Sequence, residues 1–171
     1  MRGYAERYFI KEKAGSFLNE LNKSFQLKGL ARNPQMLYMM MKIFGKGGCL
    51  PEKRALLYQG FIDYIYQYNQ QVRNVKFKHE KCEIEDFLSE TGFEFQCRNV
   101  VNAEEKAISN LKKMKEDCQG LGLLAFLTEG VKFHPHQTFQ EYFAAMRLKG
   151  YFRAMKTCVS SATLAQERQH H

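Results

Sequence analysis

The sequence predicts a mainly α fold, in which a helical bundle domain is followed by a winged-helix-like domain with one short β-hairpin. Proline is scarce, at 3 of 171 residues, and a lack of helix breakers favours long helices. Apolar residues recur at helical spacing along most of the chain. The spacing changes only after Leu123, where two short apolar runs flank a turn that contains glycine. With 44% hydrophobic residues, the chain has enough apolar side chains for a core.

We assign residues 1–72 to the helical domain and expect it to begin with short helices. Arg2–Lys13 is charged and aromatic and is predicted to form the first helix. Ser16 is the expected N-cap of a second helix, because the apolar side chains after it follow at helical spacing. Leu27–Ala31 is predicted to form a further short helix.

The dipeptide Asn33-Pro34 is a sharp signal for a helix start. Asparagine is a preferred N-cap, and proline suits the first helical position because its missing N–H would have no partner there. The predicted helix carries a wide apolar surface, made of Met36, Leu37, Met39, Met40, Ile43 and Phe44. The glycines of Gly45–Gly48 are expected to end it. Pro51 is then expected to open another helix, which runs to about Val72.

We assign residues 73–150 to the winged-helix-like domain. After a short linker, Glu83–Phe95 is predicted to form a helix. Asn102 and Glu105 have the spacing of a capping box, in which the two residues satisfy each other's backbone N–H groups. This pattern predicts a helix over Ala103–Gln119.

A short hairpin and a final helix complete the predicted order. Leu123–Leu127 and Val131–His134 are the expected strands. Thr138 and Glu141 have capping-box spacing and are expected to open the last helix. Residues 151–171 are expected to hold the end of that helix and a disordered tail, since their composition becomes small and polar.

Composition and charge point away from membrane and secreted proteins. The apolar runs near Leu37–Met41 and Leu121–Leu127 are far shorter than the roughly 18–20 residues that cross a bilayer. Met1–Tyr4 has no apolar segment typical of a signal peptide. The 5 cysteines are scattered and form no CxxC pair, which favours free thiols in a reducing compartment. We therefore expect a cytoplasmic protein. The net charge is +8, and the positively charged residues are spread along the chain, so they are interpreted as solvated surface.

The candidate chemical motifs are all better explained by structure. Gly45–Gly48 contains lysine and glycine, but a P-loop needs GxxxxGK[ST] between a strand and a helix. His134 and His136 lack the further ligands of a zinc site. No motif frames a cysteine as a nucleophile, and capping explains Glu141 without chemistry. We expect neither a catalytic residue nor a metal held by this segment.

Two stretches resemble the region that follows the ATPase core of NACHT-family proteins, which are signal-transducing ATPases of the STAND class. Leu30–Leu37 and Leu50–Tyr58 together resemble the helical segment of that region. Gly122–Leu124 and Phe133–Ala145 resemble the end of its winged-helix part, where a histidine precedes a helix start like TFQEYFAA. The spacing between the stretches is similar to that of the family, and the resemblance covers roughly residues 1–150.

The resemblance implies a switch module of a larger protein. Walker A and Walker B motifs are absent from this chain, so it implies no hydrolysis by the chain alone. The cofactor would be ADP or ATP, shared with the ATPase core of the same parent protein. ADP would hold a closed state, and exchange for ATP would release it and let the parent form a homo-oligomer. The role implied is signalling in defence or innate immunity, with no membrane and no nucleic acid as partner.

Two residues take nucleotide-contacting roles under this resemblance. Pro34 matches the family proline that packs beside the adenine. His136 matches the winged-helix histidine that reaches the β-phosphate of ADP. An imidazole N–H donates well to a phosphate oxygen, and a helix start beside it adds free N–H groups. Because His134 lies two residues earlier and Pro135 constrains the backbone, either histidine could face the nucleotide.

Two other function classes remain open at this stage. A winged helix could bind nucleic acid through Lys106, Asn110, Lys112, Lys113 and Lys115. Acidic residues in the same segment, such as Glu116 and Asp117, would repel phosphates. Alternatively, the aromatic-rich faces around Tyr58–Tyr68 could serve a helical protein–protein adaptor.

Overall fold

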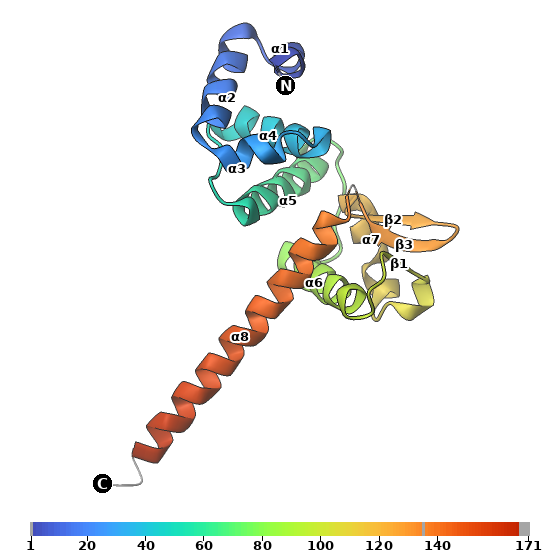
Figure 1. The fold of residues 1–171 in the computed structure, drawn as a ribbon. Coiled ribbons are helices and arrows are strands. Elements are labelled where there is room, and N and C mark those ends of the chain that lie inside the picture. The colour runs from blue at the N-terminus through green and yellow to red at the C-terminus, as the bar shows by residue number, and fades with distance from the viewer. Residues whose placement is uncertain (1, 135, 168–171) are drawn as a thin grey trace. The chain divides into compact units, whose positions relative to one another are not determined.

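A computed structural model describes residues 2–134 and 136–167 of the chain (Figure 1). The described residues are mainly helical, with one small three-stranded antiparallel sheet. The chain divides into two compact units, Met1–Phe77 and Lys78–His171, which are described separately below. No described helix combines the length and the apolar character that crossing a membrane requires.

The first unit contains five helices in its described part: α1 (Arg2–Tyr8), α2 (Lys11–Lys23), α3 (Phe25–Leu30), α4 (Pro34–Gly47) and α5 (Arg54–Gln71). The short helix expected near Leu27 is present as α3, and the Ser24 hydroxyl caps it by accepting the N–H of Leu27.

The start of the first unit differs from the prediction. Arg2–Lys13 is not one helix, because the helical conformation is interrupted between Tyr8, the end of α1, and Lys11, the start of α2. The break lets the Phe9 ring pack against Phe17 and Phe44, with ring centroids 5.7 and 5.8 Å apart. Ser16 is not an N-cap either. It lies inside α2, where its hydroxyl donates to the carbonyl of Glu12.

The helix start at Asn33 is confirmed. The Asn33 side-chain oxygen accepts the backbone N–H groups of Gln35, at 2.9 Å, and Met36, at 3.3 Å. Pro34 occupies the first turn, as expected. At the other end, Gly48 caps α4 in the left-handed conformation, with φ of 72°. That conformation favours glycine, so the glycine-rich segment is a helix end and not a phosphate loop.

α5 begins at Arg54 and not at Pro51. The carbonyl of Lys53 accepts the N–H groups of Leu56 and Leu57, which places the N-cap at Lys53. Leu50 is buried in the core of the first unit, and the chain then crosses its surface before the helix starts. That core is built mainly from α2, α4 and α5, through Phe17, Leu21, Leu37, Met40, Met41, Phe44 and Leu57.

The second unit contains α6 (Lys81–Cys97), β1 (Asn102–Ala103), a 3₁₀ turn (Glu105–Ala107), α7 (Leu111–Leu121), β2 (Leu124–Leu127), β3 (Gly130–Phe133) and α8 (Thr138–Glu167). The helix predicted over Glu83–Phe95 is confirmed as α6. It begins earlier, because the Glu83 carboxylate accepts the N–H of Glu80 and fixes the first turn there.

The helix predicted over Ala103–Gln119 is wrong in its first half. Asn102 and Ala103 form an edge strand, β1, which pairs with Lys132 and Val131 of β3. α7 starts only at Leu111, after Asn110 in a left-handed conformation with φ of 58°. Strand pairing with β3, far along the chain, therefore overrides the local capping pattern at Asn102. Local spacing does not reveal such long-range pairing.

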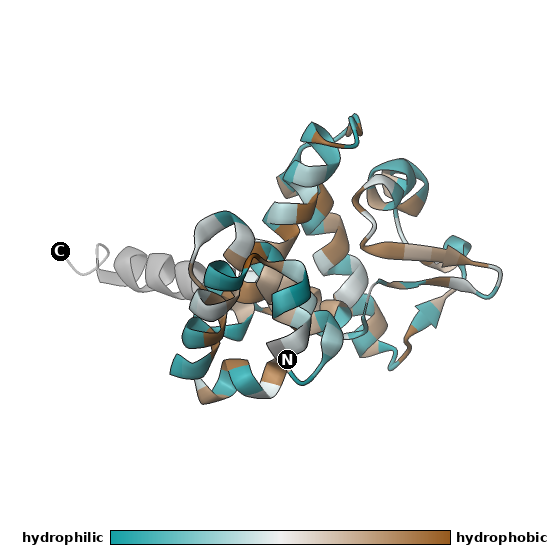
Figure 2. Cartoon of the chain, turned by 90° about the horizontal axis from the view of Figure 1, so that it is seen from above, coloured by the Kyte–Doolittle hydropathy of each residue, from teal (hydrophilic) through white to brown (hydrophobic). Residues whose placement is uncertain are grey.

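The predicted hairpin is confirmed and gains a third strand. β2 and β3 pair antiparallel from Leu124–Phe133 to Leu127–Gly130, and the sheet order is β1-β3-β2. Figure 2 shows hydrophobic residues along the strands of the hairpin. Residues 151–171 were expected to hold the helix end and a disordered tail; α8 continues to Glu167, and residues 168–171 lie outside the described part.

Candidate functional site

His136 lies at the start of α8, directly after the chain leaves the sheet. Its Nδ1 accepts the backbone N–H of Thr138, with a distance of 3.2 Å, and lies 3.2 Å from the Thr138 hydroxyl. Its carbonyl accepts the N–H of Phe139. The capping box expected from Thr138 and Glu141 is therefore replaced, because Thr138 is already the first helical residue and its N–H goes to the imidazole.

This hydrogen bond determines the tautomer of the neutral His136 ring. A nitrogen that accepts an N–H carries a lone pair, so neutral His136 bears its proton on Nε2. No described residue contacts that Nε2–H through a hydrogen bond. The ring is half-buried, and it therefore offers one donor to a ligand or partner at the start of α8, near the positive end of the helix dipole.

Packed aromatic side chains support the segment that carries His136. Phe133, the last residue of β3, packs its ring against Phe95 and Phe143, with centroids 5.9 Å apart in both pairs. Phe139 is fully buried one residue into α8. These rings hold the end of the sheet and the start of the helix in place, so the position of His136 is set by the core of the second unit.

His134 has a different setting. Its backbone N–H donates to the carbonyl of Leu123 at 2.9 Å, which extends the hairpin by one bond, and its side chain is exposed. Pro135 lies outside the described residues. The two histidines are thus separated by role, since only His136 takes part in starting α8.

Pro34 belongs to the first unit and His136 to the second. The Pro34 ring is exposed at the start of α4, although the next two turns of that helix bury Leu37 and Met41. An exposed proline at a capped helix start is a rigid apolar contact. The ring is therefore free to pack against a planar ligand or a partner surface.

Sequence reasoning missed a buried carboxylate on α7. Asp117 accepts the backbone N–H groups of Lys78 and His79 at 2.8 and 3.1 Å, and the His79 ring nitrogen Nδ1 lies 2.6 Å from Oδ2. The signal was available, because Asp117 falls on the apolar face of α7 with Met114 and Leu121. A carboxylate at such a position needs buried partners.

A second missed group surrounds Lys42 of α4. Its ammonium lies 5.0 Å from the ring centroid of Tyr8, 5.1 Å from that of Tyr38 and 5.7 Å from that of Tyr64. These rings come from α1, α4 and α5. Tyr38 and Lys42 are four residues apart and share a helix face, but the contribution of α1 and α5 needed the tertiary structure.

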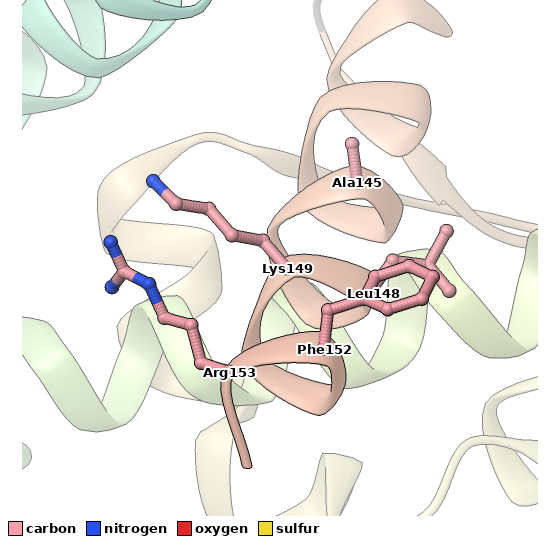
Figure 3. A pocket seen from close by; sticks show the side chains of 5 residues that line it. All are labelled: Ala145, Leu148, Lys149, Phe152 and Arg153. Atoms are coloured by element: carbon pink, nitrogen blue, oxygen red, sulfur yellow. The ribbon is translucent and has the colours of Figure 1, made fainter. Parts of the chain in front are cut away.

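A shallow hollow of about 420 Å³ lies along α8. Its lining residues are Ala145, Leu148, Lys149, Phe152 and Arg153, and Figure 3 shows Lys149 and Arg153 extending to one side while Leu148 and Phe152 lie on the other. All five come from one helix, so the hollow is an open helix surface and not an enclosed ligand site.

The chain matches no family model and no curated protein.

Proposed function

We propose that the chain is the nucleotide-sensing switch region of a NACHT-type signalling ATPase, and that it works together with an ATPase core in the same parent protein. The observation that carries this proposal is the TFQEYFAA-like segment, with His136 starting its helix and keeping Nε2–H for a ligand. ADP would stabilise the closed state by accepting this hydrogen bond at its β-phosphate. Exchange for ATP would shift the population toward the open state, in which the parent oligomerises.

Several features of the structure support this interpretation. The exposed Pro34 ring at the capped start of α4 suits packing beside an adenine. α7, the β2–β3 hairpin and α8 follow one another, which is compatible with the helix, two-stranded wing and helix of a winged-helix-like domain. The second unit also has a firm core under His136. A histidine held by such a core can report the nucleotide state, because a small shift of its phosphate partner is passed to the start of α8.

The coding sequence upstream of this segment gives a direct test. We expect a Walker A motif followed by a Walker B motif before the start of the chain, because the switch needs a core to hold the nucleotide. An upstream coding sequence that contains no such ATPase core would refute the proposal.

A pair of substitutions at His136 separates nucleotide contact from helix capping. In the chain joined to its core, His136→Asn should keep the cap, because an asparagine oxygen also accepts a backbone N–H at this position. It should nevertheless weaken ADP binding about tenfold or more, since the Nε2–H donor to a charged phosphate is lost. His136→Ala should lose both the cap and the affinity.

Isothermal titration with ADP and thermal unfolding measure the two effects. His134→Ala is the matched control, and we expect it to change neither ADP affinity nor stability by much, because that side chain is exposed. ADP affinity that is unchanged in His136→Asn but reduced in His134→Ala would move the assignment to His134.

A further inference from the structure

The ammonium of Lys42 is a half-buried cation without a counterion. Its neighbours are the rings of Tyr8, Tyr38 and Tyr64, and among the described residues no carboxylate pairs with it. Burial by itself lowers the pKa of Lys42, but interactions with Tyr8 and the other two tyrosines outweigh it and raise the pKa above its ordinary value. Lys42 therefore stays charged at neutral pH, and its charge is left for an external anion.

The tyrosines supply hydrogen-bond donors around this charge. Burial raises the pKa of Tyr64, although the nearby Lys42 acts in the opposite direction, so its phenol stays protonated at neutral pH. Tyr8 and Tyr38 are each 40% exposed. A phenol that accepts from an ammonium keeps its own O–H for another acceptor. One cation and several O–H groups are thus gathered on one accessible surface.

The rest of the first unit favours a negatively charged protein as the occupant. Lys and Arg divide equally between the units, 13 in each, but Asp and Glu number 5 in residues 1–77 and 13 in residues 78–171, so the whole net charge of +8 belongs to the first unit. Tyr68, 41% exposed, stacks on Tyr64 and extends the aromatic surface. Tyrosines beside a complementary charge are typical of protein interfaces.

The chemistry at Lys42 fits a carboxylate better than a phosphate. Phosphate sites usually gather several cations or the free N–H groups of a helix start. Lys42 is a single cation in the C-terminal half of α4, away from the helix start at Pro34. One ammonium balances one carboxylate, and the phenol O–H groups can satisfy its remaining lone pairs.

We propose that the surface formed by Tyr8, Tyr38, Lys42 and Tyr64 docks an acidic segment of a partner protein. One carboxylate of that segment accepts from Lys42 Nζ and from the tyrosine hydroxyls, and neighbouring residues of the segment lie on the aromatic surface. This docking role is independent of the proposed nucleotide switch, since neither Pro34 nor His136 belongs to the surface.

The test is a fluorescence anisotropy titration of the whole chain with fluorescein-labelled octaglutamate at low ionic strength, where exposed charges are least screened. Lys42→Met should weaken binding about tenfold, as expected for the loss of hydrogen bonds between charged groups. Lys28→Met is the matched control, because Lys28 is an exposed lysine on α3 of the same unit, and it should weaken binding less than about twofold. Tyr38→Phe keeps the ring and should weaken binding by about fivefold through the lost hydroxyl.

Tripolyphosphate and a single-stranded DNA oligonucleotide serve as competing probes. Weak competition by both, together with the two losses above, supports an acidic protein segment. Equal losses in Lys42→Met and Lys28→Met would show non-specific charge attraction and overturn the proposal. It is also overturned if octaglutamate does not bind, or if either phosphate probe binds more tightly than octaglutamate in a manner that depends on Lys42. Circular dichroism checks the folding of each variant, and Tyr38→Phe decides the outcome if Lys42→Met is unfolded.

Discussion

At the scale of single residues, Asp117 shows how one buried carboxylate organises a connector. It lies on α7 with 3% exposure and accepts two successive backbone N–H groups, those of Lys78 and His79. The ring nitrogen Nδ1 of His79 lies 2.6 Å from Oδ2 of Asp117. Each of these donors would otherwise lie part-buried without a partner, at a cost of roughly 1–3 kcal/mol for an unmet buried group. Asp117 therefore fixes where the chain enters the second unit.

The next residue, Cys118, is expected to make the free energy of unfolding fall with pH in the alkaline range. Burial, and to a smaller extent the charge of Asp117, raises the pKa of the Cys118 thiol to about 12 from an ordinary value of 9.0. The folded protein keeps the thiol neutral, whereas the unfolded chain ionises it above pH 9. The stabilisation is therefore complete below pH 9 and is lost as the pH rises toward 12.

Urea unfolding measures this prediction. Between pH 8 and pH 10, the free energy of unfolding of the wild type should fall by about 1 kcal/mol more than that of Cys118→Ala, because only the wild type carries the titrating thiol. Cys97→Ala is the control, since Cys97 is exposed and should leave the pH dependence unchanged. Parallel pH profiles for the wild type and Cys118→Ala would contradict the assigned effect of burial.

At the scale of elements, the second unit depends on close contact between α6 and α8. A Cβ at Gly92 of α6 would lie 2.9 Å from the carbonyl oxygen of Gln140 and 3.1 Å from the backbone nitrogen of Ala144. The two backbones can approach this closely only because position 92 lacks a side chain. The same contact carries Phe95 and Phe143 into the aromatic core below His136.

Gly92→Ala should therefore destabilise the second unit. Overpacking of a filled contact costs about 1–3 kcal/mol, which exceeds the gain of up to about 1 kcal/mol from replacing a helical glycine. Gly150→Ala in α8 is the matched control, because a Cβ there meets nothing within 4 Å and should stabilise the helix. Thermal unfolding should shift in opposite directions for the two variants, and a shift in the same direction would refute the close-contact explanation.

At the scale of the whole molecule, the chain is two units with different charge. The acidic residues concentrate after Phe77, and the first unit keeps the full net charge of +8. The segment between α5 and α6 contains exposed Arg73 and Lys76. Each unit has its own core, so the segment between them is expected to be the weakest point of the chain to proteases.

Limited digestion with trypsin should cleave first at Arg73 or Lys76. We expect two fragments that persist under conditions where the lysines of α7 are not yet cut, because helical backbone in a folded unit resists proteases. Mass spectrometry of the time course identifies the cuts. Early cleavage at Lys112 or Lys113 of α7 instead would contradict the division into two folded units.

The sequence alone determined the features that depend on neighbouring residues. The N-cap at Asn33, the glycine end of α4 and the turn of the β2–β3 hairpin all follow from hydrogen bonds and backbone preferences within a few positions. The TFQEYFAA-like segment was also visible as a helix start, although the cap proved to be the His136 ring and not Thr138. Local chemistry decides such features because few alternatives compete over so short a stretch.

Only the tertiary structure decided the features that join distant segments. The strand at Asn102 exists because β3 offers it a partner, and the break after Tyr8 exists because the core accepts the Phe9 ring. The carboxylate of Asp117 and the charge of Lys42 acquire their surroundings from elements far away in the chain. In each case, long-range packing and pairing stabilise the fold by more than the local preference they override, and a pattern of spacing carries no record of that competition.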